Sequence, residues 1–161
     1  MIKLKSFLII CIAFIMAFMG IKYPCYGEII NGNNLIYSKE MIPKIIKVEQ
    51  INENKIEFSY DMPVDKAKGT SPNNYWIRDI VNIKPAGIAS LGKNDKATNE
   101  NSLTKDMVEI TSKNESNKDF IMTFSKNISP GMTYRLIVYG ITIPGNSDFS
   151  GSNGFLIFTT K

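Results

Sequence analysis

The stretch SPGMTYRLIVY, residues 129–139, decides the fold because it joins a tight turn to a strand that begins with a tyrosine. Pro130 presets the first central residue of a turn, and Gly131 can take the positive φ that a type II turn requires at the second. Inward-facing positions then alternate with outward-facing ones, the inward set being Tyr134, Leu136 and Val138. This arrangement is typical of a corner between the two sheets of a sandwich. We expect the Tyr134 hydroxyl to bond back to the backbone across that corner.

The same period of two recurs from Pro43 onward. In residues 46–60, apolar and polar side chains alternate on both sides of the turn Asn52-Glu53-Asn54, which predicts a hairpin with one apolar face. Further strands are predicted at residues 74–79, 81–84, 107–111, 120–125, 133–141 and 155–160. No segment shows a sustained 3.6-residue period. Seven to eight short strands in one domain predict an all-β fold, an immunoglobulin-like antiparallel β-sandwich.

Several stretches, taken in chain order, carry a family resemblance. They are the hairpin at 46–60, MPVD at 62–65, NYWI at 74–77, PGMTY at 130–134, YGI at 139–141 and GN at 145–146. From about residue 43 to residue 160 the chain resembles the SbsA-type bacterial immunoglobulin-like domains of surface-layer and other secreted proteins. The resemblance implies a non-catalytic sandwich module. Two features depart from the family pattern: residues 88–105 are longer than usual, and the acid expected between Gly140 and Gly145 is missing.

The N-terminus has the three parts of a Sec signal peptide. Lys3 and Lys5 form a basic start, residues 7–19 are almost entirely apolar, and Cys25-Tyr26-Gly27 places small side chains at a cleavage site. We therefore predict a signal peptide at 1–27, a flexible lead-in at 28–42 and one sandwich domain at 43–161. The predicted location is extracellular or in the cell envelope. The alternative is an uncleaved membrane anchor, although Lys22 and Pro24 end the apolar run early.

Cleavage after Gly27 would change the charge and the cysteine content of the protein. The signal contains three lysines and no acid, so the formal net charge falls from +4 to about +1. Nucleic-acid binding needs a concentrated basic surface, and we do not expect it here. Both cysteines, Cys11 and Cys25, lie in the removed segment. The exported chain must then fold without a disulfide.

The residue inventory argues against an enzyme. The sequence has no histidine, and with both cysteines removed it lacks the commonest general base and the thiol nucleophile. A secreted hydrolase would need a carboxylate pair, but the acids fall in polar turns and are expected to be solvated surface: Asp61, Asp65, Asp95, Glu100, Asp106 and Glu109. The loops 94–101 and 146–153 lack the acidic spacing of a dedicated calcium loop. We predict no catalytic residue, no metal and no cofactor.

The stretch DMPVDKAKGTSPNNYWI, residues 61–77, is predicted to be a corner instead of an active-site loop. Pro63 cannot donate to a strand ladder and ends the second strand. Asp65 and Ser71-Pro72 supply turn chemistry. Tyr75 and Ile77 then return to the core. We therefore predict structural roles for Pro63, Tyr75, Ile77, Gly131 and Tyr134.

An apolar outer face is the sequence's candidate binding site. If Tyr75 and Ile77 point inward, Trp76 points outward, and by the same alternation so do Arg135, Ile137 and Tyr139. These four residues are predicted to form one patch, because the third and sixth strands are neighbours in such sandwiches. Exposed aromatic side chains beside an arginine are typical of interfaces. Alternatively, residues 88–105 or the lead-in cover this face.

Three functional classes follow. The first is a non-catalytic module for protein binding, adhesion or spacing, with a cell-surface protein as partner. The second is a carbohydrate-binding module that stacks a cell-wall glycan on Trp76 and Tyr139. The third is a hydrolase with an unrecognised carboxylate pair. A membrane contact is expected only if the signal is retained.

Overall fold

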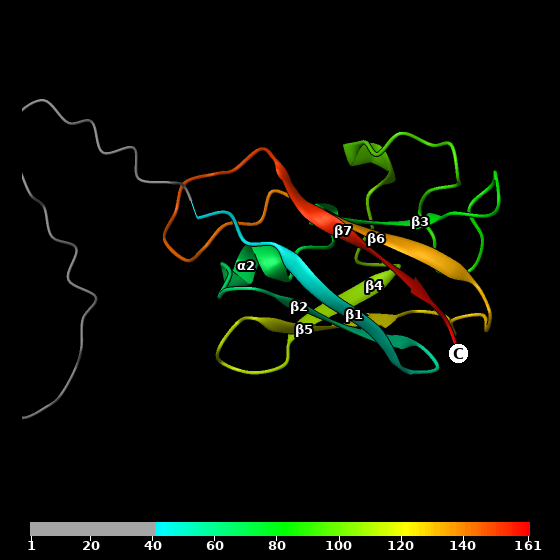
Figure 1. Cartoon of the computed structure of the whole chain (residues 1–161), viewed down its shortest axis with the longest axis horizontal. Coiled ribbons are helices and arrows are strands. Elements are labelled where there is room, and N and C mark those ends of the chain that lie inside the picture. The colour runs from blue at the N-terminus through cyan, green and yellow to red at the C-terminus, as the bar shows by residue number, and fades with distance from the viewer. Residues whose placement is uncertain (1–40) are drawn as a thin grey trace, which may run out of the picture. The chain divides into compact units, whose positions relative to one another are not determined.

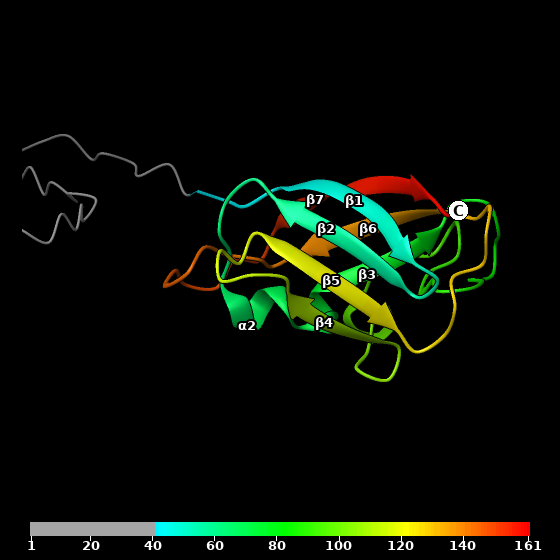
Figure 2. The same cartoon turned by 90° about the horizontal axis from the view of Figure 1, so that it is seen from below.

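The computed structural model describes residues 41–161, which form two antiparallel sheets packed face to face (Figure 1; Figure 2). The predicted signal peptide and residues 28–40 of the predicted lead-in lie outside the described residues. Within the described part of the chain, no helix is long and apolar enough to cross a membrane.

Seven strands build the two sheets. The four-stranded sheet has the order β1-β2-β5-β4 and consists of β1 (Ile45–Asn52), β2 (Lys55–Tyr60), β5 (Asp119–Phe124) and β4 (Val108–Ser112). The three-stranded sheet has the order β3-β6-β7 and consists of β3 (Tyr75–Asp79), β6 (Thr133–Tyr139) and β7 (Ser152–Thr159). With the strands lettered A to G in chain order, these are the ABED and CFG sheets of a constant-type immunoglobulin domain. The predicted fold class is confirmed.

Aromatic rings fill the space between the sheets. Phe58 stacks on Phe120 with ring centroids 5.6 Å apart, and it meets the Tyr75 ring edge-on at 5.4 Å. The Tyr75 hydroxyl donates to the Gly69 carbonyl at 2.7 Å and lies 2.9 Å from the Tyr60 hydroxyl. The buried phenols are therefore hydrogen-bonded, as burial of a polar group requires.

Residues 61–77 form the corner that carries the chain from β2 to β3. Asp65 caps the one-turn helix α2 (Lys66–Gly69) by accepting from the Lys68 amide at 2.9 Å, and the short helix η1 (Pro72–Asn74) follows. Pro63 is exposed just beyond β2. Tyr75 and Ile77 are fully buried.

The predicted strand at residues 81–84 is wrong. The Asp79 carboxylate accepts from the backbone amides of Val81 and Asn82, both at 2.9 Å, and from the Asn82 side chain at 2.8 Å. This local turn ends β3 and leaves Val81 and Ile83 exposed in a loop.

The turn before β6 contains Gly131 at φ +72°, the sign that a type II turn requires at its second central residue. Tyr134 is fully buried, but its hydroxyl does not bond within the 129–134 turn. It donates to the Ala86 carbonyl at 3.4 Å and packs against Gly87, in the connection between β3 and β4. Tyr134 thus contacts a loop 48 residues upstream instead of closing its own corner.

The buried amide of Asn153 joins two segments that are far apart in the sequence. Its Nδ2 donates to the Pro43 carbonyl at 2.9 Å and to the Ile141 carbonyl at 2.8 Å, and its Oδ1 accepts from the Ile141 amide at 2.8 Å. All three bonds are shielded from water, since Asn153 is 0% exposed. This side chain fixes the entry of the chain into β1 against the loop between β6 and β7.

Candidate functional site on the outer face of the three-stranded sheet

Strand register sets the composition of the outer face of the β3-β6-β7 sheet. Trp76 lies opposite Ile137, which lies opposite Phe155, so one row across this face is entirely apolar. In the next row Arg78 lies opposite Arg135, and Arg135 lies opposite Ile157. The structure therefore brings Trp76 and Ile137 together as direct cross-strand neighbours on one face.

Trp76, however, is not part of the exposed surface. Its side chain is 5% exposed because residues 98–101, which include the short helix η2 (Asn99–Asn101), lie over it. The indole Nε1 donates to the Thr98 carbonyl at 2.8 Å and to the Asn101 Oδ1 at 3.2 Å. The expectation of an exposed Trp76 is wrong. The alternative, that residues 88–105 cover the face, is correct at Trp76.

The remainder of the face is exposed or half-buried. We call Ile137, Tyr139, Phe155 and Ile157, with Arg135 at their edge, the open patch. Within the patch Tyr139 is 42% exposed, Phe155 is 54% exposed and Ile157 is 51% exposed. The Arg135 guanidinium lies over the Phe155 ring, with Cζ 4.6 Å from the ring centroid, and the Tyr139 hydroxyl donates to the Ser150 carbonyl at 2.9 Å. These contacts hold two of the large side chains in defined positions.

The outer face of the other sheet has a different character. There Glu57 pairs with Lys113 at 2.8 Å, and Ser59 donates to Asp119 at 2.6 Å. The Ser59 hydroxyl holds the pKa of the Asp119 carboxyl below its usual value, although partial burial opposes the shift. The central strands of this sheet thus have a polar outer surface of the ordinary kind. The edge strand β1 of this sheet exposes two separate apolar side chains, Ile46 and Ile51. The contiguous apolar and aromatic side chains of the open patch are on the other sheet.

Phe155, Ile157 and Arg78 were missed by the sequence reasoning. Phe155 and Ile157 belong to the run FLIF, residues 155–158, in which apolar side chains point to both faces and no polar partner marks the outward one. The register of β7 against β6 was needed to assign them. The signal for Arg78 was present, since it follows Trp76 by two positions and so shares its face.

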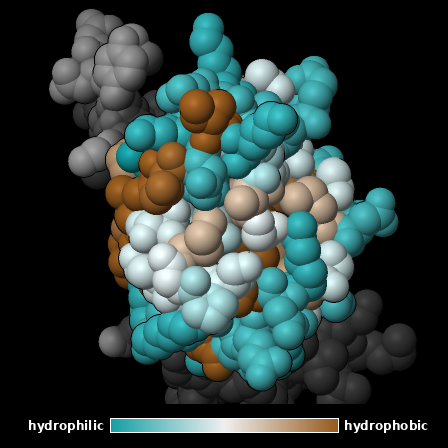
Figure 3. All heavy atoms as spheres, turned by 90° about the vertical axis from the view of Figure 1, so that its right-hand side faces the viewer, coloured by the Kyte–Doolittle hydropathy of each residue, from teal (hydrophilic) through white to brown (hydrophobic). Residues whose placement is uncertain are grey.

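Figure 3 views the sandwich from the end at which the C-terminus lies. Most of this end is hydrophilic, and the hydrophobic area is greatest along the left margin. That margin is the side that faces the viewer in Figure 1, where β1 and β7 lie in front. Apolar surface is therefore not spread evenly over the domain.

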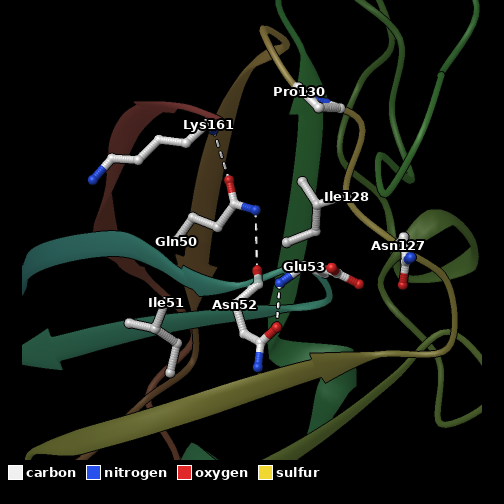
Figure 4. A pocket seen from close by; sticks show the side chains of 8 residues that line it. All are labelled: Gln50, Ile51, Asn52, Glu53, Asn127, Ile128, Pro130 and Lys161. Atoms are coloured by element: carbon white, nitrogen blue, oxygen red, sulfur yellow. Dashed lines mark hydrogen bonds between the residues drawn. The ribbon is translucent and has the colours of Figure 1, made fainter.

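A shallow hollow of about 670 Å³ lies at the same end of the sandwich, beside the β1–β2 hairpin (Figure 4). Gln50 bridges its wall: Oε1 accepts from the Lys161 amide at 2.8 Å, and Nε2 donates to the Asn52 carbonyl at 3.0 Å. The residues lining it are Gln50, Ile51, Asn52, Glu53, Asn127, Ile128, Pro130 and Lys161. Glu53 is the single side-chain carboxylate in this set, so the hollow holds no carboxylate pair.

The acids considered for catalysis have structural partners or are exposed. Asp61 accepts from the Lys44 amide at 2.9 Å, Asp65 caps α2, and Asp95 accepts from the Gly92 amide at 2.8 Å. The remaining three are exposed: Glu100, Asp106 and Glu109. Among residues 41–161, no three acidic, histidine or cysteine side chains gather closely enough to hold a metal ion.

A scan against protein-family models finds no match, and a search of curated proteins finds none either. Three solved structures of the bacterial S-layer protein SbsC are similar to the chain, each with a TM-score of 0.49 over 74% of it. The N-terminal part of SbsC is 19% identical, rSbsC(31-844) is 19% identical, and SbsC domains 1-6 is 20% identical. The chain covers 24% of the first structure and 14% of each of the others. The resemblance to SbsA-type domains stays a prediction.

Proposed function

We propose that the protein is an exported, non-catalytic immunoglobulin-like module of the cell envelope that binds another protein through the open patch. The observation that carries the proposal is the contiguous set of large apolar side chains left uncovered on the three-stranded sheet, while the central strands of the other sheet have a polar outer face. The N-terminal pattern of charge and apolar residues supports export.

The charges on this face favour a different protein over a second copy of the same chain. Arg78 and Arg135 lie directly opposite each other, and the rows that the register places on this face between β3 and β7 contain no acid. A symmetric dimer would bring two such faces together and add like charges to like charges. A partner with an apolar surface and an acidic group complements the patch instead.

Carbohydrate binding is the second candidate. The Tyr139 and Phe155 rings remain exposed on the open patch and offer aromatic surface for a sugar ring. The case is weaker than it was from sequence, because the predicted platform included Trp76, which is covered.

A photo-cross-linking side chain placed at Phe155 in the producing cells identifies the occupant of the patch. The same side chain at Ile51, which is 44% exposed but lies outside the patch, is the matched control. An adduct with a distinct protein at Phe155 and not at Ile51 supports the proposal. An adduct of two copies, a link within one chain to the lead-in, or a link to glycan would contradict it.

The partner identified by cross-linking is then purified, and its dissociation constant for each variant measures how much the patch contributes to binding. Phe155→Ser should weaken binding and raise the dissociation constant by about tenfold or more, the range for truncating an interface anchor. Ile51→Ser should leave it unchanged.

A further inference from the structure

The strands β3 and β6 place two arginines face to face on the outer surface. Of the 19 basic residues in the sequence, two are arginine, and these are Arg78 and Arg135. They are direct cross-strand partners in the β3–β6 register. Like charges directly opposite each other destabilise a sheet. The pair therefore costs stability unless other contacts offset the repulsion.

Neither guanidinium pairs with a carboxylate of residues 41–161. Arg78 donates to two backbone carbonyls, those of Lys93 at 3.3 Å and Asp95 at 2.6 Å, and Arg135 rests on the Phe155 ring. The salt bridges found in residues 41–161 involve neither arginine. The Nε atoms of both are shielded from water and have no acceptor within that range. A shielded Nε is out of a ligand's reach, but a guanidinium has five N–H donors, and the terminal nitrogens of each arginine retain donors that the described fold does not use.

The nearby acids are engaged elsewhere. Asp79 follows Arg78 directly but is 0% exposed and bonds to residues 81 and 82. The Asp95 carboxylate accepts from the Gly92 amide, so only its backbone carbonyl meets Arg78.

A hollow of about 250 Å³ opens at this arginine pair. It is lined by Arg78, Ile80, Lys93, Asn94 and Arg135. Liquid water occupies about 30 Å³ per molecule, so the hollow can admit one oxyanion group with part of its hydration but not a folded segment. Three cations and no carboxylate line a space of this size.

We propose that Arg78, Arg135 and Lys93 form a binding site for one carboxylate, supplied by an aspartate or glutamate of the protein that docks on the open patch. The planar fork of an arginine matches the two oxygens of a carboxylate, which a lysine cannot reproduce. A carboxylate carries one charge and loses less hydration beside the apolar patch than a phosphate group with nearly two. The inference rests on the proposed function, because the site lies at the edge of the open patch.

The test uses the exported protein labelled with ¹⁵N at arginine, titrated with sodium acetate. Two arginines give two Nε–H signals, assigned with Arg78→Gln and Arg135→Gln. Both signals should shift with acetate beyond their shift in sodium chloride of equal ionic strength. Arg135→Lys keeps the charge but loses the fork, and should weaken acetate binding by about tenfold. Lys113→Gln, on the outer face of the other sheet, is the control and should change nothing.

Equal shifts in acetate and chloride, or an unchanged acetate response in both Gln variants, would overturn the site. Inorganic phosphate binding more tightly than acetate would overturn the assignment to a carboxylate. Because acetate needs no partner protein, this result is separate from the cross-linking test. Acetate binding at the arginines without a cross-linked partner would support the oxyanion site and reject the proposed docking function.

Discussion

Replacing Trp76 tests whether the outer face is divided into a covered part and an open part. A buried tryptophan removes about 150–250 Å² from water, worth roughly 4–6 kcal/mol at about 25 cal/mol per Å². Alanine retains part of that burial, so Trp76→Ala should cost about 3–5 kcal/mol of unfolding free energy. Trp76→Phe keeps most of the ring but loses the donor to the Thr98 carbonyl. It should cost about 1–2 kcal/mol.

Urea unfolding followed by far-UV circular dichroism measures these changes, since Trp76 is the chain's one tryptophan and its fluorescence is lost in both variants. Phe155→Ala is the matched control, because Phe155 belongs to the same cross-strand row but is 54% exposed. The control should cost less than about 1 kcal/mol. If Trp76→Ala costs no more than Phe155→Ala, residues 98–101 do not cover Trp76 in solution and the division of the face is refuted.

Three further predictions concern buried contacts that hold loops against the strands of the three-stranded sheet. Asn153→Ala should cost about 2–4 kcal/mol by chemical denaturation, because it leaves the buried Pro43 carbonyl and its other partners unpaired; a cost under about 0.5 kcal/mol would contradict that bonding. Burial alone would raise the pKa of Asp79, but the hydrogen bonds from the turn outweigh that effect and hold the pKa below its usual value. The stability that the Asp79 carboxylate contributes should be complete above its unfolded-state pKa and decline as pH falls through the lower folded-state pKa. Asp79→Asn should therefore reduce the loss of unfolding free energy below about pH 4. An unchanged loss of stability at acid pH would exclude this role. Gly87→Ala should destabilise strongly, because Gly87 has φ +62° and a Cβ there would lie 2.2 Å from the Tyr134 hydroxyl oxygen. Tyr134→Phe alone should cost only about 1 kcal/mol, since its hydrogen bond is long, and it should relieve part of the Gly87→Ala cost in a double-mutant cycle; strict additivity would show that the two sites do not touch.

Period-two alternation predicted most of the observed strands, because one face of each is buried and its apolar residues recur at every second position. The run at 155–158 does not alternate, and the turn residues that bound it marked it as a strand. Alternation failed at residues 81–84, where Val81 and Ile83 also alternate with polar residues. There the Asp79 carboxylate satisfies the backbone locally and ends the strand. Alternation cannot detect such a competing hydrogen bond. The helix α2 was missed for a related reason, since one turn is too short to show a 3.6-residue period.

The candidate site was only partly predictable. Alternation on β3 and β6 is local and correctly placed Trp76 and Ile137 on one face. Whether that face is open depends on residues 98–101, and their contact with Trp76 is a tertiary contact that no local pattern encodes. The pairing of Arg78 with Arg135 likewise depends on register, because a shift of one residue between the strands would send one of them to the core.

The way residues 88–105 pack on β3 also restricts how a partner can bind. The amides of Ser90 and Leu91 donate to the Ile77 carbonyl at 2.9 and 3.0 Å, and the Asp79 amide donates to the Leu91 carbonyl at 2.8 Å. The Leu103 amide completes the cover by donating to the Tyr75 carbonyl at 2.9 Å. These backbone groups would otherwise form the free edge at which a foreign strand could pair. With the β3 edge occupied, strand addition is excluded on that side of the sheet. A partner that binds beside β3 must therefore use side chains, and those available are the apolar groups of the open patch and the two arginines beside it.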